Sequence, residues 1–190
     1  MGYIFLGFGM GMVYDLELGF TAGLYYAIAY SIMKAGSFLA ADLFGRAAGS
    51  FEIAHMRGIG ARYPLLGIAF TIFVLGLSGV PFTCGFLGKL LLEQAGMVTS
   101  AVSGVLLALI LALNSFISLG YYVPVLSTLS FRGKDSEHGE KQPAKKIGIP
   151  TSVVYVVVLL AFVTVYLGLF PESFGWITHA SQQLFPWGVL

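Results

Sequence analysis

Charged residues are scarce in this sequence. Asp, Glu, Lys and Arg make up 10% of its 190 residues, whereas about 25% is usual in a soluble domain. The net charge of +1 excludes a nucleic-acid-binding surface, and the single cysteine, Cys84, excludes an internal disulfide. His55, His138 and His179 show no metal-ligand spacing, and there is no phosphate-binding glycine motif and no Ser/His/Asp arrangement. The sequence therefore predicts no catalytic residue, no metal site and no cofactor.

Apolar residues dominate instead. They make up 57% of the chain, and the mean hydropathy is +0.87. Repeated apolar runs of this kind are typical of transmembrane helices, so we expect an all-α integral membrane protein with about five to six transmembrane segments. The expected segments are 2–14, 19–41, 64–77, 86–98, 101–129 and 150–170. Residues 1–170 then form a transmembrane domain with polar loops at about 42–63 and 131–149, and the aromatic and polar tail 171–190 lies at the membrane interface.

Basic residues gather in the two polar loops. The first loop holds Arg46, Arg57 and Arg62, and the second holds Arg132, Lys134, Lys141, Lys145 and Lys146. If the segments 64–77, 86–98 and 101–129 each cross the membrane, the two loops face opposite sides. The second loop carries more Lys and Arg, so the positive-inside rule places it in the cytoplasm and the C-terminus outside.

Two lysines, Lys34 and Lys89, lie inside apolar segments. A charge at the bilayer centre costs about 2.5–3.5 kcal/mol on insertion scales, so such residues face a protein interior or a wet cavity. Burial disfavours the charged form of an amine, which suits a group that releases and regains a proton. Glu93 shares a helix face with Lys89, and Tyr30 stands four residues before Lys34, where it could hydrogen-bond the amine. The alternative for Lys89 is a lysine that snorkels to the headgroups from a helix end.

The stretch SGVPFTCG, residues 78–85, predicts a break in the helical structure. Pro81 lacks a backbone donor, and Gly79 and Gly85 loosen the chain. Non-helical backbone at membrane depth is tolerated where it is buried in protein or lines a watery cavity, and such breaks mark ion sites in transporters. The alternative is an ordinary loop between two spans. Lys89, four residues beyond Gly85, favours the functional interpretation.

Two further features concern packing. The glycine-rich opening MGYIFLGFGMG predicts a tightly packed helix. Asn114 and Ser115, inside the segment 101–129, are suited to bonding a neighbouring helix.

The run RYPLLGIAFTIFVLGLSGVPFTCGFLGKLLL resembles the antiporter-like membrane subunits of respiratory complex I, which are related to multisubunit Na+/H+ antiporters and membrane-bound hydrogenases. The shared pattern is an apolar helix, then G-[IV]-P, then GF-x-GK. YYAIAYSIMKAGSFLAADL and NSFISLGYYVPVL resemble the helices on either side and lean towards the N-type subunit, and MGYIFLGFG resembles a helix near the middle of such subunits. The resemblance covers nearly the whole chain.

The resemblance implies roles for particular residues. Lys89 stands where the family has the terminal lysine of its proton path, and Lys34 stands at a relay position of the central hydrophilic axis. Some relatives carry histidine where Tyr30 stands. Glu93 is put forward by its spacing to Lys89 and not by the resemblance, and the alternative for it is a mere helix-face partner of that lysine. The predicted proton-translocation residues are thus Lys34, Lys89, Glu93 and Tyr30, beside a helix break formed by Gly79, Pro81 and Gly85.

The resemblance also implies a partner. Such subunits have about fourteen helices in two related halves, each with a broken helix, and the first half carries a glutamate–lysine pair that has no counterpart here. We therefore expect a fragment, or a chain whose front helices come from a second membrane chain, among other membrane subunits and lipids. The expected location is a prokaryotic plasma membrane. Three functions stay open: a proton-translocating subunit of an NADH:quinone oxidoreductase type complex, a subunit of a Na+/H+ antiporter or ion-pumping hydrogenase, and a scaffold that moves nothing.

Overall fold

The computed structural model describes residues 1–14, 17–99, 101–130, 150–170 and 175, and these are helical wherever they form regular structure. The elements in chain order are α1 (Gly2–Tyr14), α2 (Glu17–Ala48), η1 (Ile53–Met56), α3 (Ile59–Arg62), α4 (Pro64–Ser78), α5 (Cys84–Thr99), α6 (Ala101–Ser130) and α7 (Thr151–Leu169). The predicted loop 131–149 and, apart from Gly175, the predicted tail 171–190 lie outside the described residues. The all-α prediction is confirmed.

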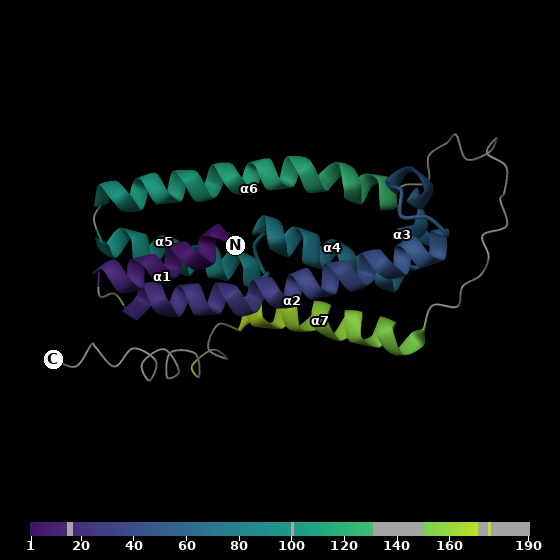
Figure 1. Cartoon of the computed structure of the whole chain (residues 1–190), viewed down its shortest axis with the longest axis horizontal. Coiled ribbons are helices and arrows are strands. Elements are labelled where there is room, and N and C mark those ends of the chain that lie inside the picture. Colours follow the sequence, from purple (N-terminus) through teal and green to yellow (C-terminus); the bar gives the residue numbers. More distant parts are fainter. Residues whose placement is uncertain (15–16, 100, 131–149, 171–174, 176–190) are drawn as a thin grey trace.

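The helices form an elongated bundle whose long axis follows α2 and α6 (Figure 1). In the described part of the chain, α2, α6 and α7 are long and apolar enough to cross a membrane. Helices α4 and α5 have 15 and 16 residues, which gives each about 22–24 Å at 1.5 Å per residue. Each alone is shorter than a hydrocarbon core of about 30 Å. They lie end to end and together match the length of α6, so they form one discontinuous crossing, as predicted near residues 78–85 (Figure 1).

Glycines bring α1 and α2 into close contact. Gly7 and Gly11 on α1 face Gly19 and Gly23 on α2, and a Cβ added at Gly7 would lie 2.5 Å from the Cα of Gly23. Each helix thus presents a small-xxx-small pair, which allows backbones to approach closely in membrane proteins. The glycine-rich opening is therefore a packing surface, as the sequence predicts. It fixes the position of the N-terminal part of α1 beside the centre of the bundle (Figure 1).

The discontinuous helix corrects the predicted membrane topology. Only two crossings, α4–α5 and α6, separate the first polar loop from the second, so the expectation that these loops face opposite sides is wrong. The backbone N–H of Gly58 donates to the carbonyl of Thr128 over 3.0 Å, which places the first loop against the C-terminal end of α6. Helix α7 begins at that same end (Figure 1). The first polar loop, the end of α6 and the start of α7 thus lie at one end of the bundle.

Cysteine labelling can test this topology. We predict that Arg57→Cys and Thr151→Cys react with a membrane-impermeant maleimide from the cytoplasmic face of sealed vesicles, because basic residues favour that side. Glu17→Cys, at the opposite end of α2, should react from the other face. All three positions are exposed, and the native Cys84 is fully buried, so it gives little background. Labelling of Arg57→Cys and Thr151→Cys from opposite faces would contradict the shared end.

Candidate functional site

Helix α4 ends at Ser78 because the residues that follow cap it and cannot continue it. Gly79 has φ +86°, a left-handed conformation that glycine adopts without steric cost. Its N–H donates to the carbonyl of Gly76 over 3.0 Å, and the N–H of Val80 donates to the carbonyl of Leu75 over 3.0 Å. This pair of bonds is a Schellman motif, which satisfies two of the last carbonyls of the helix. Pro81 follows and prevents the helix from continuing.

The start of α5 is capped by Thr83. Its hydroxyl donates to the carbonyl of Val80 over 2.7 Å and accepts from the N–H of Phe86 at 3.4 Å. This is the bonding of an N-cap residue, which satisfies a free donor in the first helical turn. Between the two caps, Phe82 has φ +70° although it carries a side chain. The hydrogen bonds of the break residues thus cap both the end of α4 and the start of α5.

The two half-helices overlap at their broken ends. A Cβ added at Gly85 would lie 1.9 Å from the carbonyl oxygen of Gly76 and 3.0 Å from the Cε of Met33. Only glycine leaves room for the backbone of α4 at this point. Gly85 is therefore required for contact between α4 and α5, whereas Gly79 is required for the turn.

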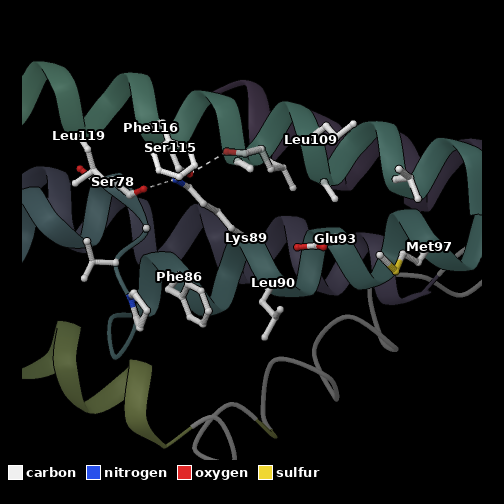
Figure 2. Close-up of a pocket in the computed structure, with 17 residues that line it drawn as sticks. Ser78, Phe86, Lys89, Leu90, Glu93, Met97, Leu109, Ser115, Phe116 and Leu119 are labelled. Carbon is white, nitrogen blue, oxygen red and sulfur yellow. Dashed lines mark hydrogen bonds between the residues drawn. The ribbon is translucent and has the colours of Figure 1, made fainter.

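Lys89 lies in the second turn of α5 and reaches back to the break. Side chains on a helix point towards its N-terminus, and the Lys89 Nζ donates to the carbonyl of Ser78 over 2.8 Å and to the hydroxyl of Ser115 over 2.9 Å (Figure 2). The residue is 7% exposed, so the snorkelling alternative does not describe it. The ammonium lies at the C-terminal, electronegative end of α4, which favours a cation.

Further contacts from α1 and α6 surround this amine. The Nζ of Lys89 lies 5.5 Å from the centroid of the Tyr3 ring. The Asn114 amide donates to the Tyr3 hydroxyl, and the Ser115 hydroxyl donates to the carbonyl of Leu111 over 2.9 Å. The prediction that Asn114 and Ser115 bond neighbouring helices is confirmed, with α1 and α5 as the partners. Tyr3 was missed, because a tyrosine at the start of an apolar segment gives no sequence signal of its own.

Beside the amine lies a cavity of about 560 Å³ between α5 and α6 (Figure 2). Its polar lining comes from Ser78, Lys89, Glu93 and Ser115, and the remaining lining is apolar. Lys89 and Glu93 share this cavity, as their spacing predicts. Among the described residues, however, no carboxylate lies at ion-pair distance from Lys89, because its chain extends towards the break and away from Glu93 (Figure 2).

Lys34 and Tyr30 lie elsewhere. No residue of α2 lines the described cavity. The Lys34 ammonium lies 5.0 Å from the centroid of the Phe38 ring, which is 64% exposed. Tyr30 stacks on Tyr26 with ring centroids 6.2 Å apart. The structure therefore brings Lys89, Glu93 and the break residues together, and it leaves Lys34 and Tyr30 outside this group, with Lys34 on an open side of α2.

The arrangement supports one kind of chemistry. The Lys89 amine has acceptors in both protonation states, because a carbonyl and a hydroxyl accept from an ammonium and from a neutral amine alike. The cavity beside it has room for water molecules, and Lys89, Glu93, Ser78 and Ser115 supply the polar partners that water needs there. A buried amine with no carboxylate partner in the described part of the chain, next to a break at mid-bundle depth, is suited to taking up and releasing a proton.

Several known proteins are similar to this chain in sequence. A sequence profile of the family described as "NADH:quinone oxidoreductase/Mrp antiporter, TM" matches residues 1–118, which include the break and Lys89. The chain is 35% identical over 183 residues to NADH-quinone oxidoreductase subunit N 2 of Chloroherpeton thalassium, covering 96% of this chain and 34% of that protein. It is 33% identical over 176 residues to NADH-quinone oxidoreductase subunit N of Chlorobium chlorochromatii, covering 93% and 34%. It is also 31% identical over 186 residues to F(420)H(2) dehydrogenase subunit N of Methanosarcina mazei, covering 91% and 34%. The chain thus spans about a third of the length of these relatives.

Proposed function

This chain belongs to the NADH:quinone oxidoreductase/Mrp antiporter membrane family, and on that premise we propose that it is part of a proton-translocating subunit in a redox-driven membrane complex of the NADH:quinone oxidoreductase type. Lys89 is the group that takes up and releases the translocated proton. The observation that carries the proposal is the buried Lys89 amine at the break, bonded to the carbonyl of Ser78 and the hydroxyl of Ser115. The relatives named as subunits of NADH-quinone oxidoreductase and F(420)H(2) dehydrogenase support the redox-driven class.

A pure scaffold explains Lys89 less well. An ionised amine in an apolar interior carries a large desolvation cost, so a residue with only a packing role would be more stable as an apolar side chain of similar size. The broken helix is a second such feature, because non-helical backbone at membrane depth occurs where protein buries it or where it lines a watery cavity. Both features are accounted for if the site exchanges protons. Glu93, in the same cavity, supplies a second proton-accepting group on the route.

Lys34 is the second proposed relay residue. It lies near the middle of α2, half-buried over the exposed ring of Phe38. A cation at this depth in lipid costs about 2.5–3.5 kcal/mol on insertion scales, so its open face requires cover by protein. We infer that a second membrane segment packs over Lys34 and Tyr30 and extends the polar route from there. It belongs to the front helices of the antiporter-like fold, from a separate chain or from the same one.

Membership in this family also supports a proposal for the membrane, the orientation and the partners of the chain. We place the chain in a prokaryotic cell membrane, with the basic end of the bundle in the cytoplasm and lipid around its exposed apolar side chains. The other partners are membrane subunits of the same complex.

Co-purification and reconstitution test the proposed class. A complex isolated from native membranes through a tag on this chain should contain iron–sulfur redox subunits, and an electron donor plus a quinone should acidify vesicles that hold it. The family description also names the Mrp antiporter, which supports the alternative of a Na+/H+ antiporter subunit. This alternative predicts Na+-driven proton movement without redox proteins. That result would overturn the redox-driven proposal.

A further inference from the structure

The Lys89 ammonium is held by three helices, and one of these contacts is of a different kind from the others. Helices α4 and α6 provide oxygen acceptors, whereas α1 provides the face of the Tyr3 ring, 5.5 Å from the Nζ. We propose that Tyr3 is a positioning residue for proton exchange at Lys89: its ring stabilises the ammonium form, and Asn114 fixes the ring in place. This inference rests on the proposed function of Lys89.

The ring contact distinguishes the two protonation states of the amine. An ammonium is attracted to the negative face of an aromatic ring, whereas a neutral amine lacks that electrostatic attraction. The oxygen acceptors of Ser78 and Ser115 serve both forms. The Tyr3 ring therefore stabilises the protonated form of Lys89 over the neutral form. Loss of the ring would shift the equilibrium of this amine towards proton release.

Two contacts fix the plane of the Tyr3 ring. At one end, its hydroxyl accepts a hydrogen bond from the Asn114 amide. At its side, it meets Tyr26 of α2 edge-on, with centroids 5.4 Å apart and an interplanar angle of 87°. Edge-to-face packing is a preferred geometry for aromatic pairs. The ring is thus held between α2 and α6, with its face available to the ammonium.

Asn114 and Ser115 link the ring to the amine through α6. They are consecutive residues, and one bonds the Tyr3 hydroxyl while the other accepts from Lys89. A shift or rotation of α6 at this point would move both contacts together. The ammonium would then lose an acceptor and its ring face at the same time, which favours proton release.

Ring electrostatics can be tested without a change of shape. Tyr3→Phe should keep part of the proton-translocation rate of the assembled complex, because the ring face and its edge contact with Tyr26 stay while the bond to Asn114 is lost. Replacing that phenylalanine by its mono-, di- and trifluoro analogues weakens the ring face at nearly constant volume. We expect the rate to fall with each fluorine, and to fall about fivefold to thirtyfold in Tyr3→Leu, which corresponds to about 1–2 kcal/mol for a desolvated cation–π contact. A purely structural role for Tyr3 would leave the rate constant across the fluorinated series.

Controls separate this inference from the proposed function. Tyr14→Leu removes an exposed tyrosine from the other end of α1 and should retain the wild-type rate. Lys89→Met is measured in parallel. If Lys89→Met is inactive and the fluorinated series keeps one constant rate, the role of Tyr3 is wrong and that of Lys89 stands. If Lys89→Met translocates protons as wild type does, the proposed function itself fails, and with it the inference.

Discussion

Lys89→Met should reduce proton translocation by the assembled complex at least about tenfold, the change that 1.36 kcal/mol of barrier produces. Methionine has nearly the length of lysine and cannot carry a proton. Assembly should survive, because the substitution removes a buried charge together with its desolvation cost. The carbonyl of Ser78 and the hydroxyl of Ser115 lose a donor, a penalty of about 1–3 kcal/mol for a buried unsatisfied group that works against this gain. The measurement is donor-driven acidification of vesicles, normalised to the amount of intact complex.

A matched variant makes the Lys89 result specific. Arg57→Met also removes one positive charge and introduces methionine, but at an exposed position near the end of the bundle. It should translocate protons at the wild-type rate. Equal losses in Lys89→Met and Arg57→Met would point to a general effect of charge, and wild-type translocation in Lys89→Met would refute the relay role.

Gly85→Ala should have the largest effect on stability. The added Cβ would lie 1.9 Å from the carbonyl oxygen of Gly76, and that carbonyl belongs to backbone that cannot rotate aside. Overpacking of this kind typically costs about 1–3 kcal/mol and occasionally more, and we expect Gly85→Ala at or above the upper end. The half-helices α4 and α5 would separate, and the yield of assembled complex and its midpoint of thermal unfolding in detergent should both fall.

Gly120→Ala is the control for this prediction. Gly120 lies inside α6 with no atom within 4 Å of an added Cβ. Alanine there gains helix propensity, up to about 1 kcal/mol relative to glycine, so the variant should be as stable as wild type or more stable. If Gly85→Ala matches Gly120→Ala in yield and in unfolding midpoint, the close approach of α4 and α5 is not a structural requirement.

Local chemistry made much of the fold predictable. The apolar runs identify helices because lipid leaves the backbone no other partner. Gly79 and Pro81 marked the end of α4 for reasons of backbone geometry, and Lys89 was expected next to the break. Helix α2 begins earlier and ends later than predicted, at Glu17 and Ala48. Beyond residue 41 the helix carries Asp42 and Arg46, which end the apolar run in the sequence but pair with each other one helical turn apart, at 2.8 Å.

Tertiary packing decided the rest. Whether two short apolar segments make two crossings or one depends on how their ends meet, and that is set by the contact between Gly85 and Gly76. The sequence alone gave no measure of this contact, so the predicted topology was wrong. Tyr3 is 86 positions from Lys89 along the chain, and only the close packing of α1 against α2 brings them together. The orientation of Lys34 follows from which face of α2 is buried.

The most direct measurement of the central claim is the chemical state of the Lys89 nitrogen in the working complex. Nitrogen NMR of complex labelled with [¹⁵N]lysine separates ammonium from neutral amine, and the difference spectrum against Lys89→Met isolates this one residue. We predict a Lys89 signal that changes between the ammonium and amine forms when electron donor and quinone are supplied, and that does not change without them. A Lys89 nitrogen that stays an ammonium throughout turnover would contradict proton exchange at this site.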